Sequence, residues 1–170
     1  MSEPVNIRLT VNREKISRSV EPRDTLADFL RQALELTGTH TGCEMGVCGA
    51  CLVLVDDVVV HSCLMYAVQA SGSTVETIEG LAERGAIADI QDAFYERNAL
   101  QCGFCTPGML MTAYSFLSSP GVPSREEIRD ALSGNYCRCT GYQAIVDAIE
   151  NVARRRAEAA TAPKIEKGRL

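Results

Sequence analysis

Hydrophobic and polar residues alternate near the start of the chain, which is the pattern of a half-buried β-strand. A strand over residues 5–11 would place four apolar side chains on one face: Val5, Ile7, Leu9 and Val11. Residues 15–21 are expected to return as its hairpin partner. The following segment, TLADFLRQALEL, begins at Thr25 with a sequence like a capping box, and its spacing predicts an amphipathic helix.

Two β-branched stretches follow a glycine-rich loop and predict a second hairpin over residues 51–55 and 58–63. Asp56 and Asp57 lie between them, and we expect a tight turn there because aspartate tolerates the left-handed backbone conformation. A further short strand is expected at residues 74–78. The surrounding segment, SGSTVETIEGLAERGA, has few large apolar residues in its first part and indicates a linker or a surface wrap.

Helical patterns dominate the second half of the chain. Residues 86–98 fit one amphipathic helix, and three more helices are expected from about 106 to 117, from 125 to 132 and from 140 to about 160. Each of these three begins at a capping signal: Thr106 before Pro107, Ser124 with Glu127, and Thr140 with Gln143. The first half therefore reads as a small mixed sheet with a helix, and the second half as a helical bundle.

Length and composition suit a packed soluble protein with one large domain or two small ones. The chain has 170 residues, of which 46% are hydrophobic and 23% are charged. We expect a cytoplasmic protein without a membrane span, because we see neither a secretory signal nor an apolar run long enough to cross a bilayer. The formal net charge of −5 argues against nucleic-acid binding.

The unusual feature of the composition is its eight cysteines, against two histidines and no tryptophan. They form two groups, one made of Cys43, Cys48, Cys51 and Cys63, the other of Cys102, Cys105, Cys137 and Cys139. Disulfides are disfavoured, because the expected compartment is reducing and one residue between Cys137 and Cys139 is an awkward span for a bridge. The other gaps have the lengths of metal-ligand spacings.

The first group has the spacing C-x4-C-x2-C, followed by eleven residues and the fourth cysteine, which is the plant-type [2Fe–2S] pattern. The glycines between these cysteines let the backbone approach a compact anionic cluster and turn its N–H groups toward the sulfurs. A zinc site is the alternative, but zinc modules usually carry two C-x2-C-like pairs. We interpret the nearby His40 and His61 as surface or supporting groups rather than ligands.

The second group has the spacing C-x2-C, then thirty-one residues, then C-x-C. Each pair precedes a predicted helix, so two helix N-termini would point at one anionic centre and stabilise it. On spacing alone a zinc site remains open here. Beside a ferredoxin-like cluster, a second cluster is favoured, and two clusters would form an electron relay.

Three segments, GCEMGVCGAC, QCGFCTPGM and GNYCRCTGY, closely resemble the iron–sulfur subunit of the molybdenum hydroxylases, the xanthine oxidase family. The resemblance covers about residues 4–155. It implies an α+β protein with an N-terminal β-grasp domain, of the plant-type ferredoxin kind, followed by an all-α four-helix-bundle domain. Each domain would hold one [2Fe–2S] cluster. We expect domains over 1–80 and 81–160 and a basic tail over 161–170, which is either a solvated end or a contact for an acidic partner.

The same resemblance implies two partner chains, in an assembly expected to be a dimer of heterotrimers. A large subunit would hold molybdenum on a pterin cytosine dinucleotide or related cofactor, and a medium subunit would hold FAD. Electrons would pass from substrate to molybdenum, to the second cluster, to the first and then to FAD. Gln101 matches a residue that typically bonds the pterin, and Cys139 matches the ligand closest to it. The alternative for Gln101 is a structural cap on nearby backbone.

No P-loop and no G-x-G-x-x-G fingerprint is evident, and no residue is a credible general base, so we assign no catalytic residue to this chain. The substrate of the whole enzyme could be carbon monoxide, an aldehyde, a purine or another N-heterocycle. Three alternatives stay open: a reductive relative of the aromatic acyl-CoA reductase type, a free-standing ferredoxin, and a zinc-stabilised interaction module without redox role.

Overall fold

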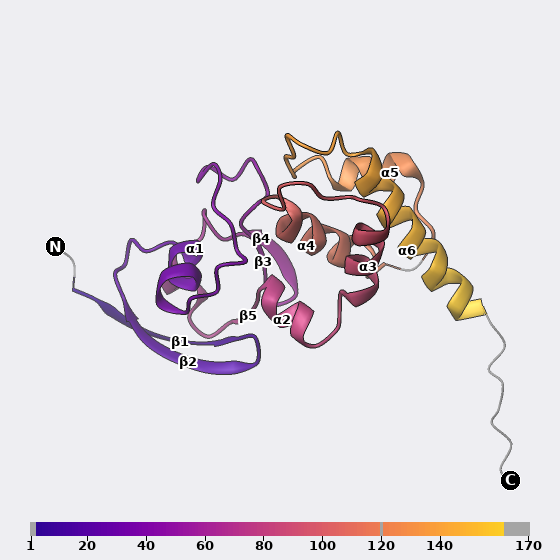
Figure 1. Ribbon diagram of the computed structural model, residues 1–170. Helices are drawn as coiled ribbons and strands as arrows, with labels where there is room; N and C mark the ends of the chain where they lie inside the picture. Colours follow the sequence, from indigo (N-terminus) through magenta and orange to yellow (C-terminus); the bar gives the residue numbers. More distant parts are fainter. Residues whose placement is uncertain (1–2, 120, 162–170) are drawn as a thin grey trace, which may run out of the picture.

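The computed structural model describes residues 3–119 and 121–161. Its N-terminal half is built on one five-stranded sheet with the strand order β2-β1-β5-β3-β4 (Figure 1). The strands are β1 (Val5–Val11), β2 (Glu14–Val20), β3 (Leu52–Val55), β4 (Val58–His61) and β5 (Thr74–Glu76). β1 runs antiparallel to β2 and parallel to β5, so the two predicted hairpins lie on opposite sides of β5.

Both hairpins close through two residues with left-handed backbone, the geometry that matches the twist of paired strands. The φ angles are 49° at Asp56 and 65° at Asp57, which confirms the predicted turn. Asn12 and Arg13 form the same kind of turn between β1 and β2, with φ of 47° and 72°. The predicted alternation of β1 also holds, except that Val5 at the end of the strand is exposed.

The helix predicted over residues 25–36 is shorter and wider than expected. Thr25 caps a single turn, α1 (Leu26–Asp28), by accepting a hydrogen bond from the Asp28 amide, as its sequence indicated. The chain then continues as a π-helix, η1 (Phe29–Ala33), in which Leu34 N–H donates to the Phe29 carbonyl. A left-handed residue, Glu35, follows the helix, and Leu34 and Leu36 still pack against the core of the sheet.

The segment expected to be a linker folds into regular structure instead. After the short helix η2 (Ala67–Ala70) and β5, residues Ile78–Glu83 form helix α2. The linker prediction was wrong because it weighed the small number of apolar residues rather than their positions: Leu81 is fully buried, and α2 packs against α4. The predicted domain boundary at residue 80 falls inside this helix.

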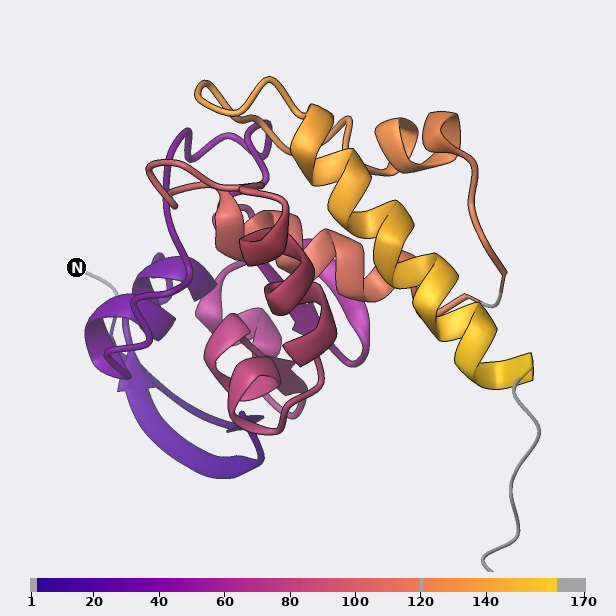
Figure 2. The same cartoon turned by 45° about the vertical axis from the view of Figure 1, so that its right-hand side comes forward.

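Four longer helices make up the rest of the described chain, in agreement with the helical pattern. They are α3 (Ala88–Glu96), α4 (Thr106–Phe116), α5 (Arg125–Ala131) and α6 (Gln143–Thr161). Figure 2 shows α6, in yellow, lying across this half of the molecule, where it packs on α3 and α5. Ser124 and Glu127 form the predicted capping box of α5. Of the predicted basic tail, residues 162–170 lie outside the described residues.

Strand β3 joins the two halves because all four of its side chains are buried. Val53 and Val55 belong to the core between the sheet and α1, η1 and η2. Leu52 and Leu54, which point to the other face, belong to the core of the helical half. One strand therefore contributes to both hydrophobic cores. Within residues 3–119 and 121–161, no helix has the length and apolar composition needed to cross a membrane.

We predict that Leu81→Ala destabilises the chain by about 2–5 kcal/mol, because it opens a cavity in the core of the helical half. Urea unfolding of the full chain, followed by circular dichroism, measures the change. Val58→Ala is the matched control, since Val58 is exposed next to a turn and its truncation should cost less than about 0.5 kcal/mol. Equal effects of the two substitutions would contradict a core role for α2.

Candidate iron–sulfur sites

The first group of cysteines surrounds the open end of the β3–β4 hairpin. Cys51 directly precedes β3 and Cys63 follows β4, and both are buried. Ser62 holds the two strand ends together, because its amide and its hydroxyl both donate to the Cys51 carbonyl, at 3.3 and 2.6 Å. Cys43 and Cys48 lie in the preceding loop and are half-buried. The hairpin thus supplies two rigid positions and the loop two adaptable ones.

Backbone amides in this loop point at a cysteine sulfur, as the glycine pattern indicated. The amides of Val47 and Cys48 donate to Cys43 Sγ at 3.3 and 3.4 Å. Hydrogen bonding from the Met45 amide, together with these two, lowers the pKa of Cys43 to about 6. Burial has the opposite effect at Cys51 and raises its pKa to about 11. Cys43 is therefore ready to act as a thiolate ligand, while Cys51 needs a bound cation to ionise.

The second group of cysteines is carried by two loops of the helical half. Cys105 is the N-cap of α4, and Cys102 lies one turn before it. Cys137 and Cys139 lie in the loop that leads to α6. The sulfurs of Cys102 and Cys139 are 3.7 Å apart. Two thiolates on one tetrahedral metal with bonds of about 2.3 Å are separated by about 3.8 Å, so this pair has the spacing needed to share an iron.

The remaining two cysteines of this group, Cys105 and Cys137, are half-buried, and their pKa values shift in opposite directions. Burial raises the pKa of Cys105 to about 12, and the neighbouring Cys137 sulfur adds to the shift. Burial also acts to raise the pKa of Cys137, but hydrogen bonds from the hydroxyl and amide of Thr140 outweigh it, and the net shift is downward. These donors lie 3.0 and 3.4 Å from Cys137 Sγ. Of the two half-buried cysteines, Cys137 is therefore the one whose thiolate form the surrounding hydrogen bonds stabilise.

Thr140 does not cap the last helix, so that prediction was wrong. Its hydroxyl oxygen donates to Cys137 and accepts from the Tyr142 amide at 3.2 Å, and α6 begins only at Gln143. The expected second helix N-terminus is replaced by this loop, whose own amide reaches the sulfur. Sequence reasoning missed Thr140 as a supporting residue, although a hydroxyl directly after the C-x-C motif was an available signal.

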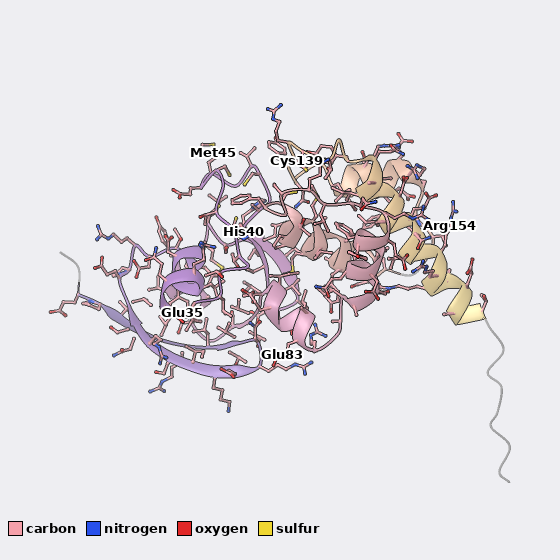
Figure 3. All side chains as sticks on the ribbon, in the orientation of Figure 1. Glu35, His40, Met45, Glu83, Cys139 and Arg154 are labelled. Atoms are coloured by element: carbon pink, nitrogen blue, oxygen red, sulfur yellow. The ribbon has the colours of Figure 1, made fainter. Side chains whose placement is uncertain are left out.

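The two groups of cysteines are in contact through their loops, which lie along one edge of the molecule (Figure 3). Tyr136 N–H donates to the carbonyl of Cys48 at 2.9 Å. This hydrogen bond joins Cys48 of the first group directly to the residue that precedes Cys137 of the second group. The rings of His40 and Phe104 stack with centroids 4.7 Å apart, and His40 Nδ1 lies 2.7 Å from the Phe104 carbonyl oxygen. His40 therefore supports the contact between the loops.

Among the described residues, no three His, Cys, Asp or Glu side chains converge on a position for a single metal ion. A [2Fe–2S] cluster requires a different arrangement, two thiolates on each of two irons. The cysteines lie in neighbouring pairs of that kind: Cys43 with Cys48, Cys51 with Cys63, Cys102 with Cys139, and Cys105 with Cys137. The donor set, all sulfur with N–H and O–H groups around it, fits such clusters.

Exposure distinguishes the two sites. Cys102 and Cys139 are exposed, and Gln101 beside them is exposed as well. At the first site Cys51 and Cys63 are buried, whereas the exposed side chains of Met45 and Leu64 lie on the segments next to its cysteines. The second site therefore exposes two of its own cysteines, whereas the first site is flanked by exposed apolar side chains.

A sheet-based domain and a helical domain, each with four cysteines arranged in pairs, define a protein with two iron–sulfur domains. The family profile described as "2Fe-2S iron-sulfur cluster binding domain" matches residues 9–82, and that described as "[2Fe-2S] binding domain" matches residues 77–150. The chain is 53% identical over 150 residues to the gamma subunit of caffeine dehydrogenase from Pseudomonas sp. (strain CBB1), which covers 86% of this chain and 90% of that one.

Two further comparisons agree. The small subunit of nicotine 6-hydroxylase from Paenarthrobacter nicotinovorans is 49% identical over 148 residues, or 87% of this chain and 89% of that subunit. A chain in the crystal structure of quinoline 2-oxidoreductase from Pseudomonas putida 86 superposes with a TM-score of 0.85 and 50% identity, covering 92% of this chain and 99% of that one. The protein therefore belongs to the iron–sulfur small subunits of the molybdenum hydroxylase family, whose role is electron transfer.

This membership confirms the predicted fold class and the two [2Fe–2S] domains. The α+β architecture, with a ferredoxin-like domain before a helical one, is the arrangement that the resemblance implied. It also confirms that the chain is a subunit of an oxidoreductase. The comparisons give no support to the alternatives of a zinc-stabilised interaction module or a reductive relative.

We predict that Thr140→Val lowers the midpoint potential of the [2Fe–2S] cluster expected at Cys137, because donors to cluster sulfur favour the reduced form. One such bond, worth about 1 kcal/mol, corresponds to about 40 mV for a one-electron couple. A redox titration monitored by EPR measures the shift. Thr140→Ser keeps the hydroxyl and should retain the potential, so a shift of equal size in both variants would contradict the role of the hydroxyl.

Proposed function

We propose that the chain relays single electrons through two [2Fe–2S] clusters. Each cluster would be held in its own domain, the first over residues 1–80 and the second over residues 81–160. Cys43, Cys48, Cys51 and Cys63 would hold the first cluster, and Cys102, Cys105, Cys137 and Cys139 the second. The clusters, when bound, supply the one-electron carriers. The observation that carries the proposal is the pairing of the cysteines, above all the 3.7 Å separation of the Cys102 and Cys139 sulfurs.

We infer that the second site faces a large subunit with a molybdenum–pterin cofactor, as the cytosine dinucleotide or a related form. Its support is the exposure of Cys102, Cys139 and Gln101, which leaves two ligands and an amide side chain free to meet another cofactor. Gln101 and Cys139 are the residues we assign to the pterin contact. An amide can both donate to and accept from the polar edge of a pterin.

We infer that the first site faces a medium subunit that carries FAD, in a cytoplasmic dimer of heterotrimers. Two large apolar side chains beside this site, Met45 and Leu64, are 68% and 61% exposed. Exposed apolar groups around a redox centre suit a partner surface that excludes water. Electrons would then enter at Cys139, cross between the loops and leave near Cys43.

The hydrogen bond between the loops supports electron transfer between the two sites. Cys48 and Tyr136 are joined backbone to backbone at 2.9 Å, and Tyr136 is bonded covalently to Cys137. The Asn135 side chain adds a second bond, from its Nδ2 to the Gly49 carbonyl at 3.4 Å. A short connection of this kind holds the two ligand loops at a constant separation.

We propose a nitrogen heterocycle as the substrate of the whole enzyme, oxidised on the large subunit. The support is that the relatives compared above are named for caffeine, nicotine and quinoline, which are all nitrogen heterocycles. The site of that oxidation lies on another chain, so the residues of this subunit do not choose the substrate.

Low-temperature EPR of the dithionite-reduced chain, with iron and labile sulfide assayed on the same sample, tests the relay. We expect two distinct S = 1/2 signals and about four irons per chain. Cys48→Ser should remove the first signal and keep the second, and the reciprocal Cys137→Ser should do the opposite, since the two sets share no ligand. A silent sample with about two zincs per chain would end the relay proposal.

We predict that Gln101→Ala slows electron entry into the chain while both clusters are retained, because it removes the amide contact to the pterin. Stopped-flow reduction of the assembled enzyme by its substrate measures the rate, and we expect a loss of roughly tenfold, equivalent to one lost hydrogen bond of about 1.4 kcal/mol. Gln143→Ala, an exposed glutamine at the start of α6, is the control. An unchanged rate for Gln101→Ala would remove this residue from the pathway.

A further inference from the structure

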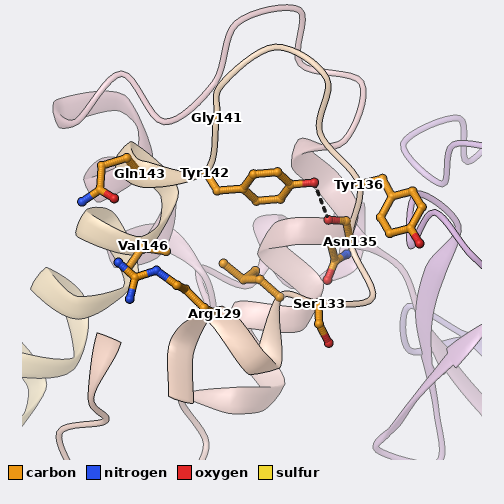
Figure 4. Close-up of a pocket in the computed structure, with 9 residues that line it drawn as sticks. Arg129, Ser133, Asn135, Tyr136, Gly141, Tyr142, Gln143 and Val146 are labelled. Carbon is orange, nitrogen blue, oxygen red and sulfur yellow. Dashed lines mark hydrogen bonds between the residues drawn. The ribbon is translucent and has the colours of Figure 1, made fainter. Parts of the chain in front are cut away.

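Tyr142 has a backbone conformation that is unusual for a bulky residue. Its φ angle is 67°, and Gly141 before it has the same value, so two successive residues are left-handed. A side chain with a Cβ adopts this region at a cost, and the surroundings must hold it there. The turn directs the tyrosine ring back toward the loop that carries Cys137 (Figure 4).

The Tyr142 hydroxyl bridges the two sides of Tyr136. It accepts a hydrogen bond from the Cys137 amide at 2.7 Å and donates one to the Asn135 carbonyl at 3.1 Å. Both bonds satisfy backbone groups of a loop that belongs to no helix or strand. One phenol oxygen therefore fixes the backbone conformation between Asn135 and Cys137.

The residues on either side of this bridge are tied to the rest of the molecule. Asn135 is buried, and its side chain accepts from the Thr112 hydroxyl on α4 at 2.8 Å. Tyr136 donates its amide to Cys48 in the first cysteine loop. The segment 135–137 is thus held at each residue, by α4, by the first loop and by Tyr142.

Tyr142 also acts on the sulfur of Cys137 through Thr140. Its amide donates to the Thr140 hydroxyl oxygen at 3.2 Å, and that hydroxyl donates to Cys137 Sγ at 3.0 Å. The amide and the phenol of one residue therefore reach the two ends of Cys137, its sulfur through Thr140 and its backbone N–H directly.

We propose that Tyr142 is a positioning residue for electron transfer: its hydroxyl holds the Cys137 backbone in register with the first cysteine loop, and so keeps the Cys137 sulfur at the Thr140 donor that the Tyr142 amide holds. This inference rests on the proposed binding of a cluster by Cys137. The competing explanation is that the ring only fills space, because Tyr142 lines a cavity of about 320 Å³ between α5 and α6.

Two matched substitutions separate these explanations. Tyr142→Phe keeps the ring and removes only the bridging oxygen. Tyr136→Phe removes a hydroxyl from a second tyrosine that lines the same cavity and whose side chain is exposed (Figure 4). Both variants are made in the full chain with its clusters, and iron content, EPR spectra and midpoint potentials are measured.

We expect Tyr142→Phe to keep about four irons per chain, to shift the g-values of the second cluster, and to lower its potential, because the Cys137 backbone is no longer fixed and its sulfur moves away from the Thr140 donor. Tyr136→Phe should match the wild type in all three measurements. Selective loss of the second signal in Tyr142→Phe would also support the proposal, since it shows that Cys137 has lost its position.

Three results would overturn it: a Tyr142→Phe protein with unchanged g-values and potential, equal shifts in both variants, or loss of both clusters together, which would show support of the whole fold instead. Failure of the underlying relay is seen separately, because the wild-type chain would then lack iron.

Discussion

The contact between the backbones of Gly49 and Gly108 is the constraint on which the relation of the two sites depends. A Cβ on Gly108 would lie 2.0 Å from the Gly49 carbonyl oxygen, and one on Gly49 would lie 2.4 Å from the carbonyl oxygen of Gly134. Only residues without side chains allow the first cysteine loop to approach α4 and the second loop this closely. The bond from Tyr136 to Cys48 depends on that approach.

Shared packing maintains this contact. Because β3 places Val53 in the core of the sheet and Leu54 in the core of the helical half, neither half can move without disturbing both cores. The two cysteine sites are therefore carried by one packed unit, although each belongs to its own domain. Electron transfer over a set distance benefits from such rigidity, since a loose joint would vary the separation of the carriers.

Negative charge at the sulfurs is stabilised locally at each site. Backbone amides in a loop with left-handed residues at Glu44 and Gly46 act on Cys43, and a hydroxyl and an amide act on Cys137. Neither site relies on a nearby basic side chain in these contacts. Hydrogen bonds to sulfur both stabilise thiolates and adjust reduction potential, so the same donors serve assembly and electron transfer.

Cysteine spacing and the aspartate turn could be read from the sequence, because a loop around a cluster and a two-residue hairpin are decided by neighbours along the chain. Helix α2 and the widened turns of η1 could not be read in this way, and for Thr140 the sequence offered a hydroxyl beside the C-x-C motif but not its partner. Leu81 is recognisable as a core residue only when α4 is beside it, and Thr140 only when its hydroxyl has a sulfur to meet. These features depend on contacts made in three dimensions, where burial and hydrogen bonding override local pattern.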